Sequence, residues 1–191
     1  SSELIEISKR FGVGAKKSSF QKAGFYVNGR VMTGSIEILK PSKKSLSSIL
    51  QEPHNVPPHF KVPKKSLSEW KKLKGSKKIK RKKNGFEYTF AEGSIPFPDK
   101  LDEPSRTILT SEGGLGPSRT RHIIHQSGIG YRRLTPVELE KLNGFPRNWT
   151  LKAGPLGDAP DGVRGFLMGN ALVVGIVEKI SKVIANDLGK F

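Results

Sequence analysis

The sequence predicts a mixed α+β chain, with a β-rich, loop-rich part over residues 1–130 and a short helical part over residues 131–191. Three observations support this prediction. The 191 residues include 21 glycines and 13 prolines, and only 35% are hydrophobic, as in folds with many turns. Short apolar and aromatic runs between turn residues dominate the first part. The clearest helix-start signals and the clearest apolar stripe at helical spacing lie in the second.

The first elements expected along the chain are a hairpin and a helical turn. Residues 25–27 and 30–32 are apolar or aromatic runs joined by Asn28-Gly29, a pair that supplies the positive φ angles of a type I′ turn. Residues 45–50 favour a helical turn. Residues 53–63 contain four prolines and are expected to be extended and irregular.

A basic block follows, and it is interpreted as a positively charged loop that tracks a phosphate backbone. The alternatives are a disordered solvated tail or a segment that resembles a nuclear-localisation signal. Its position inside the chain favours the loop. After it, Phe86, Tyr88 and Phe90 alternate as in a strand with one aromatic face. The basic block consists of Lys71, Lys72, Lys74, Lys77, Lys78, Lys80, Arg81, Lys82 and Lys83.

Residues 95–121 are rich in turn formers, and short strands are expected at 107–110 and 122–124 on either side of a glycine loop. Arginines lie at the edges of this loop. Their guanidinium groups suit contacts with phosphates or with guanine edges.

Two helices are expected near the C-terminus. Thr135 is a good N-cap, Pro136 fits the first helical position, and Glu138 completes a capping box. Gly144 is expected to end that helix. The last helix is expected from about Asn170, as its N-cap, to about Asn186. Its apolar stripe consists of Val173, Ile176, Val177, Ile180 and Ile184.

The charge of the chain favours a polyanionic partner. Lys and Arg number 34 against 17 Asp and Glu, a formal net charge of +17, and the pI is near 10.2. Nucleic acid is the commonest partner of such a protein. No apolar run approaches the roughly 18 residues that span a bilayer. No membrane partner is therefore expected, and the expected location is the bacterial cytoplasm, in association with the nucleoid.

The absence of cysteine limits the chemistry that the chain can perform. The sequence has none, so disulfides, thiolate zinc sites and a cysteine nucleophile are all excluded. The histidine pairs at 54 and 59 and at 122 and 125 have no cysteine or convergent carboxylates in the nearby sequence, and no metal site is expected.

Two segments together carry a family resemblance. Residues 131–146 read Tyr-Arg-Arg-Leu-Thr-Pro-Val-Glu-Leu-Glu-Lys-Leu-Asn-Gly-Phe-Pro, and residues 166–174 read Phe-Leu-Met-Gly-Asn-Ala-Leu-Val-Val. In this order and spacing they resemble the last two motifs of the cytosine-C5 DNA methyltransferases. Upstream, residues 104–107 are similar to a feature late in the recognition region of bacterial members.

The resemblance implies a C-terminal portion of such an enzyme. Residues 1–130 would be the target-recognition lobe, which reads double-stranded DNA, and residues 131–191 would complete the doubly wound α/β methyltransferase domain of a partner. In the family, a cysteine thiolate attacks C6 of a flipped cytosine, and methyl passes from S-adenosylmethionine to C5. The Pro-Cys segment and the N-terminal cofactor loop are missing from this sequence. The chain is therefore expected to hold no catalytic residue and to be inactive alone.

The resemblance also implies that Asn170, Ala171 and Leu172 border the methionine end of S-adenosylmethionine, which the partner would mainly bind. A helix N-terminus there would favour the cofactor carboxylate. Residues 111–121 are expected to read bases, with Glu112 as an acceptor for cytosine N4. Beyond the basic block, the expected DNA contacts are Arg106, Thr107, Ser111, Glu112, Arg119 and Arg121.

Two alternatives stay open. The chain is either the small subunit of a split, heterodimeric restriction-modification methyltransferase or a fragment of a longer chain. The split subunit is slightly favoured, although a start at Ser1 also fits a trimmed chain. The competing class is a non-enzymatic, basic nucleic-acid-binding module. That class accounts for the charge and the aromatic residues but not for the paired terminal motifs.

Overall fold

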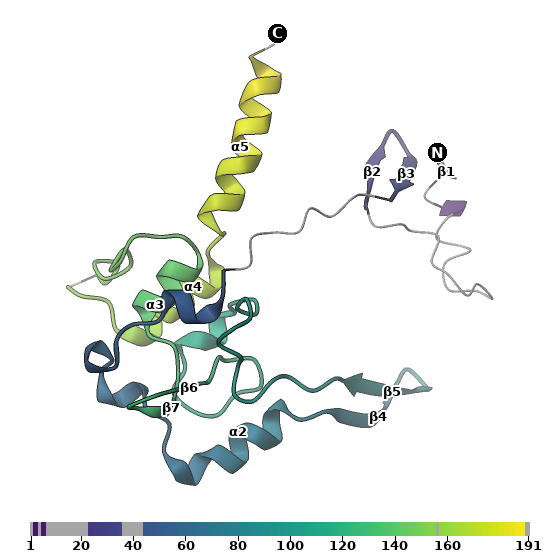
Figure 1. Cartoon of the computed structure of the whole chain (residues 1–191). Helices are drawn as coiled ribbons and strands as arrows, with labels where there is room; N and C mark the ends of the chain where they lie inside the picture. The colour runs from purple at the N-terminus through teal and green to yellow at the C-terminus, as the bar shows by residue number, and fades with distance from the viewer. Residues whose placement is uncertain (1, 4, 7–22, 36–43, 156, 190–191) are drawn as a thin grey trace. The chain divides into compact units, whose positions relative to one another are not determined.

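The computed structural model describes residues 2–3, 5–6, 23–35, 44–155 and 157–189 (Figure 1). Contacts divide the chain into two compact units, Ser1–Ser42 and Lys43–Phe191. The described residues form helices and small antiparallel sheets, which confirms the α+β class.

The described part of the first unit is an antiparallel sheet in the order β1-β3-β2. In its hairpin, Val27 pairs with Arg30, and the turn between them has φ values of 49° at Asn28 and 78° at Gly29. Positive φ at both positions is the signature of a type I′ turn, so the hairpin predicted from the Asn-Gly pair is confirmed. The strands are β1 (Ser2–Glu3), β2 (Ala23–Val27) and β3 (Arg30–Gly34).

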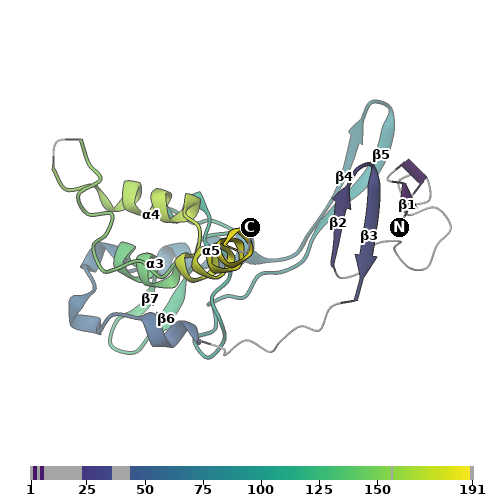
Figure 2. The ribbon, with the colours of Figure 1, turned by 90° about the horizontal axis from the view of Figure 1, so that it is seen from above.

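The second unit combines two isolated strand pairs, β4-β5 and β6-β7, with helices and 3-10 turns (Figures 1 and 2). The strands are β4 (Lys77–Lys83), β5 (Phe86–Glu92), β6 (Ile124–Gln126) and β7 (Gly130–Arg132). The α-helices are α2 (Leu67–Lys74), α3 (Pro136–Leu142), α4 (Asp161–Asn170) and α5 (Val174–Leu188). The 3-10 helices are η1 (Leu46–Ile49), η2 (Pro53–Asn55), η3 (Pro58–Phe60), η4 (Lys64–Ser66) and η5 (Thr110–Gly113).

Two buried clusters form the core of this unit, one on each side of the start of β6. One cluster contains Ile124 and the other Ile123, as expected where successive side chains point to opposite faces of extended backbone. The first cluster joins residues from both sides of position 130, so packing does not separate residues 43–130 from 131–191. Its buried members are Leu46, Ile124, Leu134, Leu139 and Met168, and those of the second are Val62, Trp70 and Ile123.

The capping box predicted at the start of α3 is confirmed. Thr135 Oγ1 accepts a hydrogen bond from Glu138 N at 3.3 Å, and Glu138 Oε2 accepts one from Thr135 N at 2.8 Å. The same carboxylate accepts hydrogen bonds from both terminal nitrogens of Arg132, at 2.6 and 2.8 Å. Gly144 follows the helix with a φ of +80°, the left-handed conformation that commonly ends a helix.

The strand predicted at residues 107–110 is wrong, because residues 107–109 have no regular structure and Thr110–Gly113 form η5. Only the last residue of the strand predicted at 122–124 lies in β6. Tertiary packing overrides the local β preference here, since η5 lies directly against α4.

The single final helix predicted from Asn170 to Asn186 is also wrong at its start. Asn170 is the last residue of α4, and its side-chain amide donates to Phe166 O at 3.2 Å. Residues 171–173 form a break, with Ala171 and Val173 extended, before α5 begins at Val174. The break allows Val174 N to donate to Asn143 O at 2.9 Å, at the end of α3.

Contact between α4 and η5 depends on glycines that bring two backbones together. A Cβ on Gly169 would lie 2.3 Å from Thr110 N and 2.4 Å from Leu109 C, and a Cβ on Gly165 would lie 2.9 Å from Gly113 N. These distances are well inside van der Waals contact, so any side chain must displace backbone. The glycines of α4 therefore fix the position of η5.

Replacing Gly169 with alanine should lower the free energy of unfolding by at least about 2 kcal/mol, because the added methyl group meets backbone atoms rather than a side chain. Urea unfolding measures the loss. Gly175→Ala is the matched control, since nothing lies within 4 Å of a Cβ at that position. It should be neutral or stabilising by up to about 1 kcal/mol through helix propensity. Equal stability of the two variants would contradict the close approach.

Candidate nucleic-acid interface

The predicted basic loop is a two-stranded ribbon, β4-β5, and the last turn of α2. The two strands lie side by side in both views (Figures 1 and 2). Asn84 and Gly85, with φ values of 51° and 79°, form a tight turn of the type I′ class. Within the described residues of the second unit, no other helix or strand packs broadly on either face of the ribbon. The interpretation as a loop was wrong because the turn and the alternating aromatic residues of β5 impose strand pairing on the lysine-rich segment.

The register sorts the side chains of the ribbon onto two faces, since directly paired residues share a face. Six of the seven residues of β4 are cations. The lysine face consists of Lys78, Lys80 and Lys82 with their partners Ala91, Thr89 and Glu87. The aromatic face consists of Lys77, Ile79, Arg81 and Lys83 with their partners Glu92, Phe90, Tyr88 and Phe86.

The aromatic face is open to solvent and contains an oriented arginine. Phe86 is 77% exposed and Tyr88 is 42% exposed. Arg81 Cζ lies 4.1 Å from the ring centre of Phe90, a cation–π contact that restricts the guanidinium. The strand with one aromatic face, predicted from the alternation at 86, 88 and 90, is confirmed.

Arg119 holds the root of the ribbon. Its Nη1 donates to Leu73 O at 2.9 Å and to Gly75 O at 2.6 Å, just before β4. Its Nη2 donates to Gly93 O, just after β5, and its Nε lies 3.3 Å from a carboxylate oxygen of Glu92. With its donors occupied in this way, Arg119 serves as a clamp on the ribbon, and the DNA contact predicted for it stays a prediction.

Lys74 and Arg106 both bind the buried carboxylate of Asp99, and their contact with DNA stays a prediction. Arg106 Nε lies 2.5 Å from Asp99 Oδ1 and Lys74 Nζ lies 3.5 Å from Oδ2. Ile123 N also donates to Asp99 Oδ2, at 2.9 Å. The Lys74 side chain is fully buried, and its Nζ donates to Arg121 O at 2.9 Å.

The charges around Asp99 shift two pKa values. Burial by itself raises the pKa of the Asp99 carboxyl, but the hydrogen bond from Arg106, the charge of His122 and the Ile123 N–H outweigh it and leave the pKa below its ordinary value. Burial lowers the pKa of Lys74, and Asp99 only partly opposes that effect. The group is therefore a structural node whose charges face inward.

The polar groups of the predicted base-reading loop are also engaged within the protein. Glu112 is buried, and its Oε1 accepts from His122 N at 3.0 Å and lies 2.6 Å from His122 Nδ1. It is not available to accept from cytosine N4. Arg121, also buried, donates from Nε to Ser111 O at 2.7 Å and from Nη1 to Gly116 O.

The other predicted contacts remain accessible. Thr107 is exposed and Ser111 is half-buried, with its hydroxyl 2.9 Å from the hydroxyl of Thr120. Of the basic block, Lys77 is half-buried and the remaining members apart from Lys74 are exposed. The accessible cations thus lie on α2 and the ribbon, whereas Arg106, Arg119 and Arg121 at the edges of the glycine loop bind partners within the protein.

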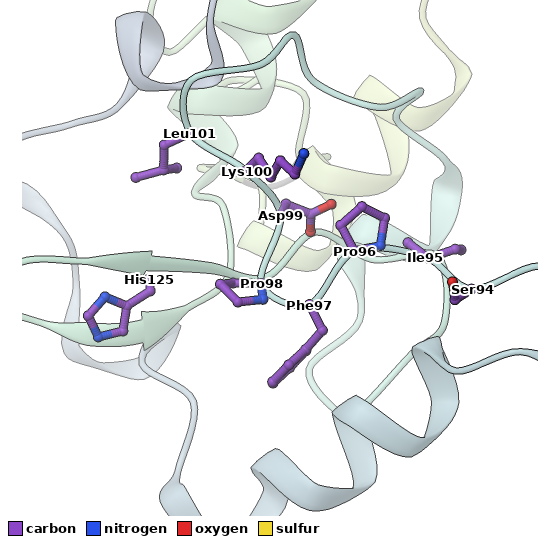
Figure 3. Close-up of a pocket in the computed structure, with 9 residues that line it drawn as sticks. All are labelled: Ser94, Ile95, Pro96, Phe97, Pro98, Asp99, Lys100, Leu101 and His125. Atoms are coloured by element: carbon purple, nitrogen blue, oxygen red, sulfur yellow. The ribbon is translucent and has the colours of Figure 1, made fainter.

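The segment that follows β5 in the sequence lines a surface hollow that the sequence analysis did not predict. The hollow is lined by residues 94–101 and by His125 of β6 (Figure 3). One wall is rigid, because Phe97 stacks on Tyr131 with ring centres 5.7 Å apart, and His125 meets Tyr131 edge-on at 4.9 Å. Only tertiary contacts bring His125 beside residues 94–101, so no local sequence signal pointed to the hollow.

The apolar stripe of α5 is open to solvent along its whole length. No residue of α5 is buried, and Ile176, Ile180 and Ile184 are 57%, 55% and 53% exposed. After its first residues the helix continues away from α3 and α4 (Figure 1). Regular spacing of exposed isoleucine and valine on one side of a helix is typical of a surface that another segment covers.

The segment predicted to border the cofactor has a different geometry from the one expected. Asn170 lies at the C-terminal end of α4, where backbone carbonyls rather than N–H groups are exposed. Leu172 is 73% exposed, between α4 and α5. The predicted helix N-terminus at Asn170 is therefore wrong, and the contact of residues 170–172 with a cofactor stays a prediction.

Within the part of the chain that the structure describes, no three His, Asp or Glu side chains converge as metal ligands. None of the helices described is long and apolar enough to cross a membrane.

Comparisons with known proteins agree on one family. A family model described as C-5 cytosine-specific DNA methylase matches residues 12–186. The chain is similar to the Type II methyltransferase M.Sau3AI of Staphylococcus aureus, with 38% identity over 185 residues. The match covers 95% of this chain and 40% of that relative, so the chain spans well under half of its length. No solved structure matches the chain.

The Asp99 carboxylate should make stability depend on acid pH. Its native pKa is depressed, so its contribution is present above the unfolded-state value of about 4 and is lost as the pH falls through the lower native value. Asp99→Asn should cost about 3–5 kcal/mol at pH 7, because two cations lose a buried partner. It should also flatten the loss of stability below pH 4, as measured by urea unfolding. Asp102→Asn, at an exposed position, is the control and should change neither quantity.

Arg119→Lys should loosen the ribbon without changing net charge, because an ammonium group cannot reproduce the guanidinium fork. We expect amide hydrogens of β4 and β5 near the root to exchange about 10-fold faster, while those of α3 are unchanged. Hydrogen exchange followed by NMR measures both. Arg147→Lys, at an exposed arginine, is the matched control. Unchanged exchange in the ribbon of Arg119→Lys would rule out the clamp.

Proposed function

The chain belongs to the C-5 cytosine-specific DNA methylase family, and we propose that it is the DNA-recognition portion of a methyltransferase acting on cytosine C5 in duplex DNA. The catalytic portion, with the cysteine nucleophile and most of the S-adenosylmethionine site, would come from another polypeptide or from an N-terminal half of the same longer chain. The recognition portion would hold the duplex and position the target cytosine for extrusion, since the reacting atoms are shielded within stacked DNA.

A separate catalytic portion is proposed because the chain contains no cysteine and spans 40% of its relative. Serine hydroxyls cannot replace a thiolate at neutral pH without an activating base. The motifs of residues 131–146 and 166–174 resemble the last two motifs of the family, and the motifs that carry the chemistry would precede them. This argument holds equally for a natural split subunit and for a portion of one longer chain.

The observation that carries the proposal is the uncovered stripe of α5. Covering a large aliphatic side chain stabilises a complex by about 1.5–3 kcal/mol, and the stripe presents several in one row. A self-contained binding module has no use for such a surface. A catalytic domain with an open sheet face does, since helices pack on both faces of a doubly wound sheet. We therefore propose that α5 docks on the catalytic portion.

DNA is the proposed substrate because of where the accessible positive charge lies. The exposed cations lie on α2 and on the two faces of the ribbon, whereas Lys74, Arg106 and Arg119 are held by internal partners. Contacts of this kind with phosphates weaken steeply with salt. They would orient the duplex without reading its sequence.

S-adenosylmethionine supplies the methyl group in this family, and the fit of residues 170–172 to it is partial. The end of α4 offers carbonyl oxygens near Asn170 and the amide of that residue donates to Phe166 O, so these residues do not form a site for the cofactor carboxylate by themselves. Bordering a site formed by the catalytic portion is compatible with their exposure. Docking of α5 would bring them to that site.

The alternative is a non-enzymatic nucleic-acid-binding module. The charge of the ribbon favours it as strongly as it favours the enzyme. The open α5 stripe does not favour it.

Methyl transfer by the reconstituted enzyme tests the proposal. We expect the chain to restore transfer of tritiated methyl from S-adenosylmethionine to DNA when it is mixed with the product of a neighbouring reading frame that carries a Pro-Cys segment, or when that segment is fused upstream. Ile180→Asp should reduce association at least about 100-fold, because a charge would be buried in the interface.

Asn186→Asp adds the same charge on the opposite side of α5, where the side chain is exposed, and should restore transfer like the parent chain. Binding of DNA with no transfer in any combination would favour the non-enzymatic module. Equal activity of the two variants would exclude α5 as the docking helix.

A further inference from the structure

The two faces of the β4-β5 ribbon differ in the chemistry of their side chains, which suits them to different contacts. The lysine face has flexible ammonium groups that water solvates well. The aromatic face has exposed rings at Phe86 and Tyr88 and, between them and the root, the restricted guanidinium of Arg81. Covering aromatic rings that are exposed to water is favourable. Burying a lysine ammonium group without a partner is unfavourable.

The ribbon also lacks internal support. A two-stranded hairpin with nothing on either face is marginally stable in water, and within the second unit no other described helix or strand packs broadly on this one. Its like charges on β4 repel one another. A polyanion whose groove admits a two-stranded ribbon relieves both problems, and the major groove of duplex DNA has that width.

We propose that the ribbon enters the major groove with its aromatic face toward the base edges, and that Arg81 reads a guanine there. The inference rests on the proposed function, which supplies DNA as the partner. Arg81 donates to guanine O6 and N7 as a fork, and Phe90 is a positioning residue that holds the guanidinium. Phe86 and Tyr88 contact neighbouring base edges, including thymine methyl groups.

The lysine face then lies outward, at the rim of the groove. Lys78, Lys80 and Lys82 recur at every second residue of one strand, about 6.8 Å apart. Their stems are long enough to reach phosphates on the flanking backbone. They supply affinity without sequence preference, as phosphate contacts do. A protein partner on the aromatic face is less favourable, because it would have to cover Arg81, Lys83 and Lys77 together with the rings.

Selection from a random duplex library with the 191-residue chain, followed by anisotropy titrations at several salt concentrations, tests the assignment. The parent chain should select a guanine at a defined position. Arg81→Lys should lose that preference and bind the selected duplex on the order of 10-fold to 100-fold more weakly, with little change for unrelated duplexes. A 7-deazaguanine at that position should weaken the parent chain similarly and leave Arg81→Lys unaffected.

Lys80→Ala is the matched control from the other face. It should weaken binding to all duplexes equally and reduce the slope of log K against log salt by about 1, with the selected sequence unchanged. Phe90→Leu keeps an apolar partner for Ile79 but removes the ring beneath Arg81. It should weaken the guanine preference with no change in the salt slope, an effect that a loss of folding would not produce.

Each other outcome has a defined meaning. If the chain binds DNA but selects no guanine, or if Arg81→Lys behaves like Lys80→Ala, the assignment of the aromatic face is overturned while DNA recognition stands. If Phe86→Ser leaves DNA binding intact and weakens association with the catalytic polypeptide, that face meets protein instead. If the parent chain binds no duplex at all, the proposed function fails together with this inference.

Discussion

The buried carboxylate of Asp99 is the interaction on which the arrangement of the second unit depends. It binds Lys74 at the end of α2, Arg106 in the turn-rich segment and the backbone of Ile123 at the start of β6. Three parts of the chain that are distant in sequence therefore meet at one charge. Loss of that charge would leave the buried Lys74 and the half-buried Arg106 without a carboxylate partner, a cost of several kcal/mol. The ribbon begins just after one of these parts, the end of α2.

Positive charge consequently has two separate roles in this protein. Cations next to Asp99 and Glu92 are held by these carboxylates and set the geometry. Cations on β4 have few acidic neighbours and are open to solvent. Net charge of +17 predicts a polyanionic partner for the whole chain, but burial decides which cations can meet it. The arginines at the edges of the glycine loop instead bind partners within the protein, and Arg119 holds the root of the ribbon.

The second unit also joins segments from both sides of residue 130, where the sequence predicts a division. Backbone contact between α4 and η5 joins the glycine loop directly to the helix that ends at Asn170. One core cluster also contains residues from both sides of position 130. A division at residue 130 describes motifs rather than packing. The exposed stripe of α5 is the exception, because no residue of this helix is buried by the described part of the unit.

Local signals alone determined the hairpin turn at Asn28-Gly29, the aromatic alternation of β5 and the capped helix after Thr135, since each depends on residues within a few positions of one another. They also determined the apolar stripe of α5 and the family. Only the tertiary structure decided that Lys74, Glu112 and Arg119 face inward, that Asn170 ends a helix instead of starting one, and that residues 107–110 are not a strand. The reason is that burial and ion pairing depend on which distant segments meet, and short-range periodicity does not contain that information.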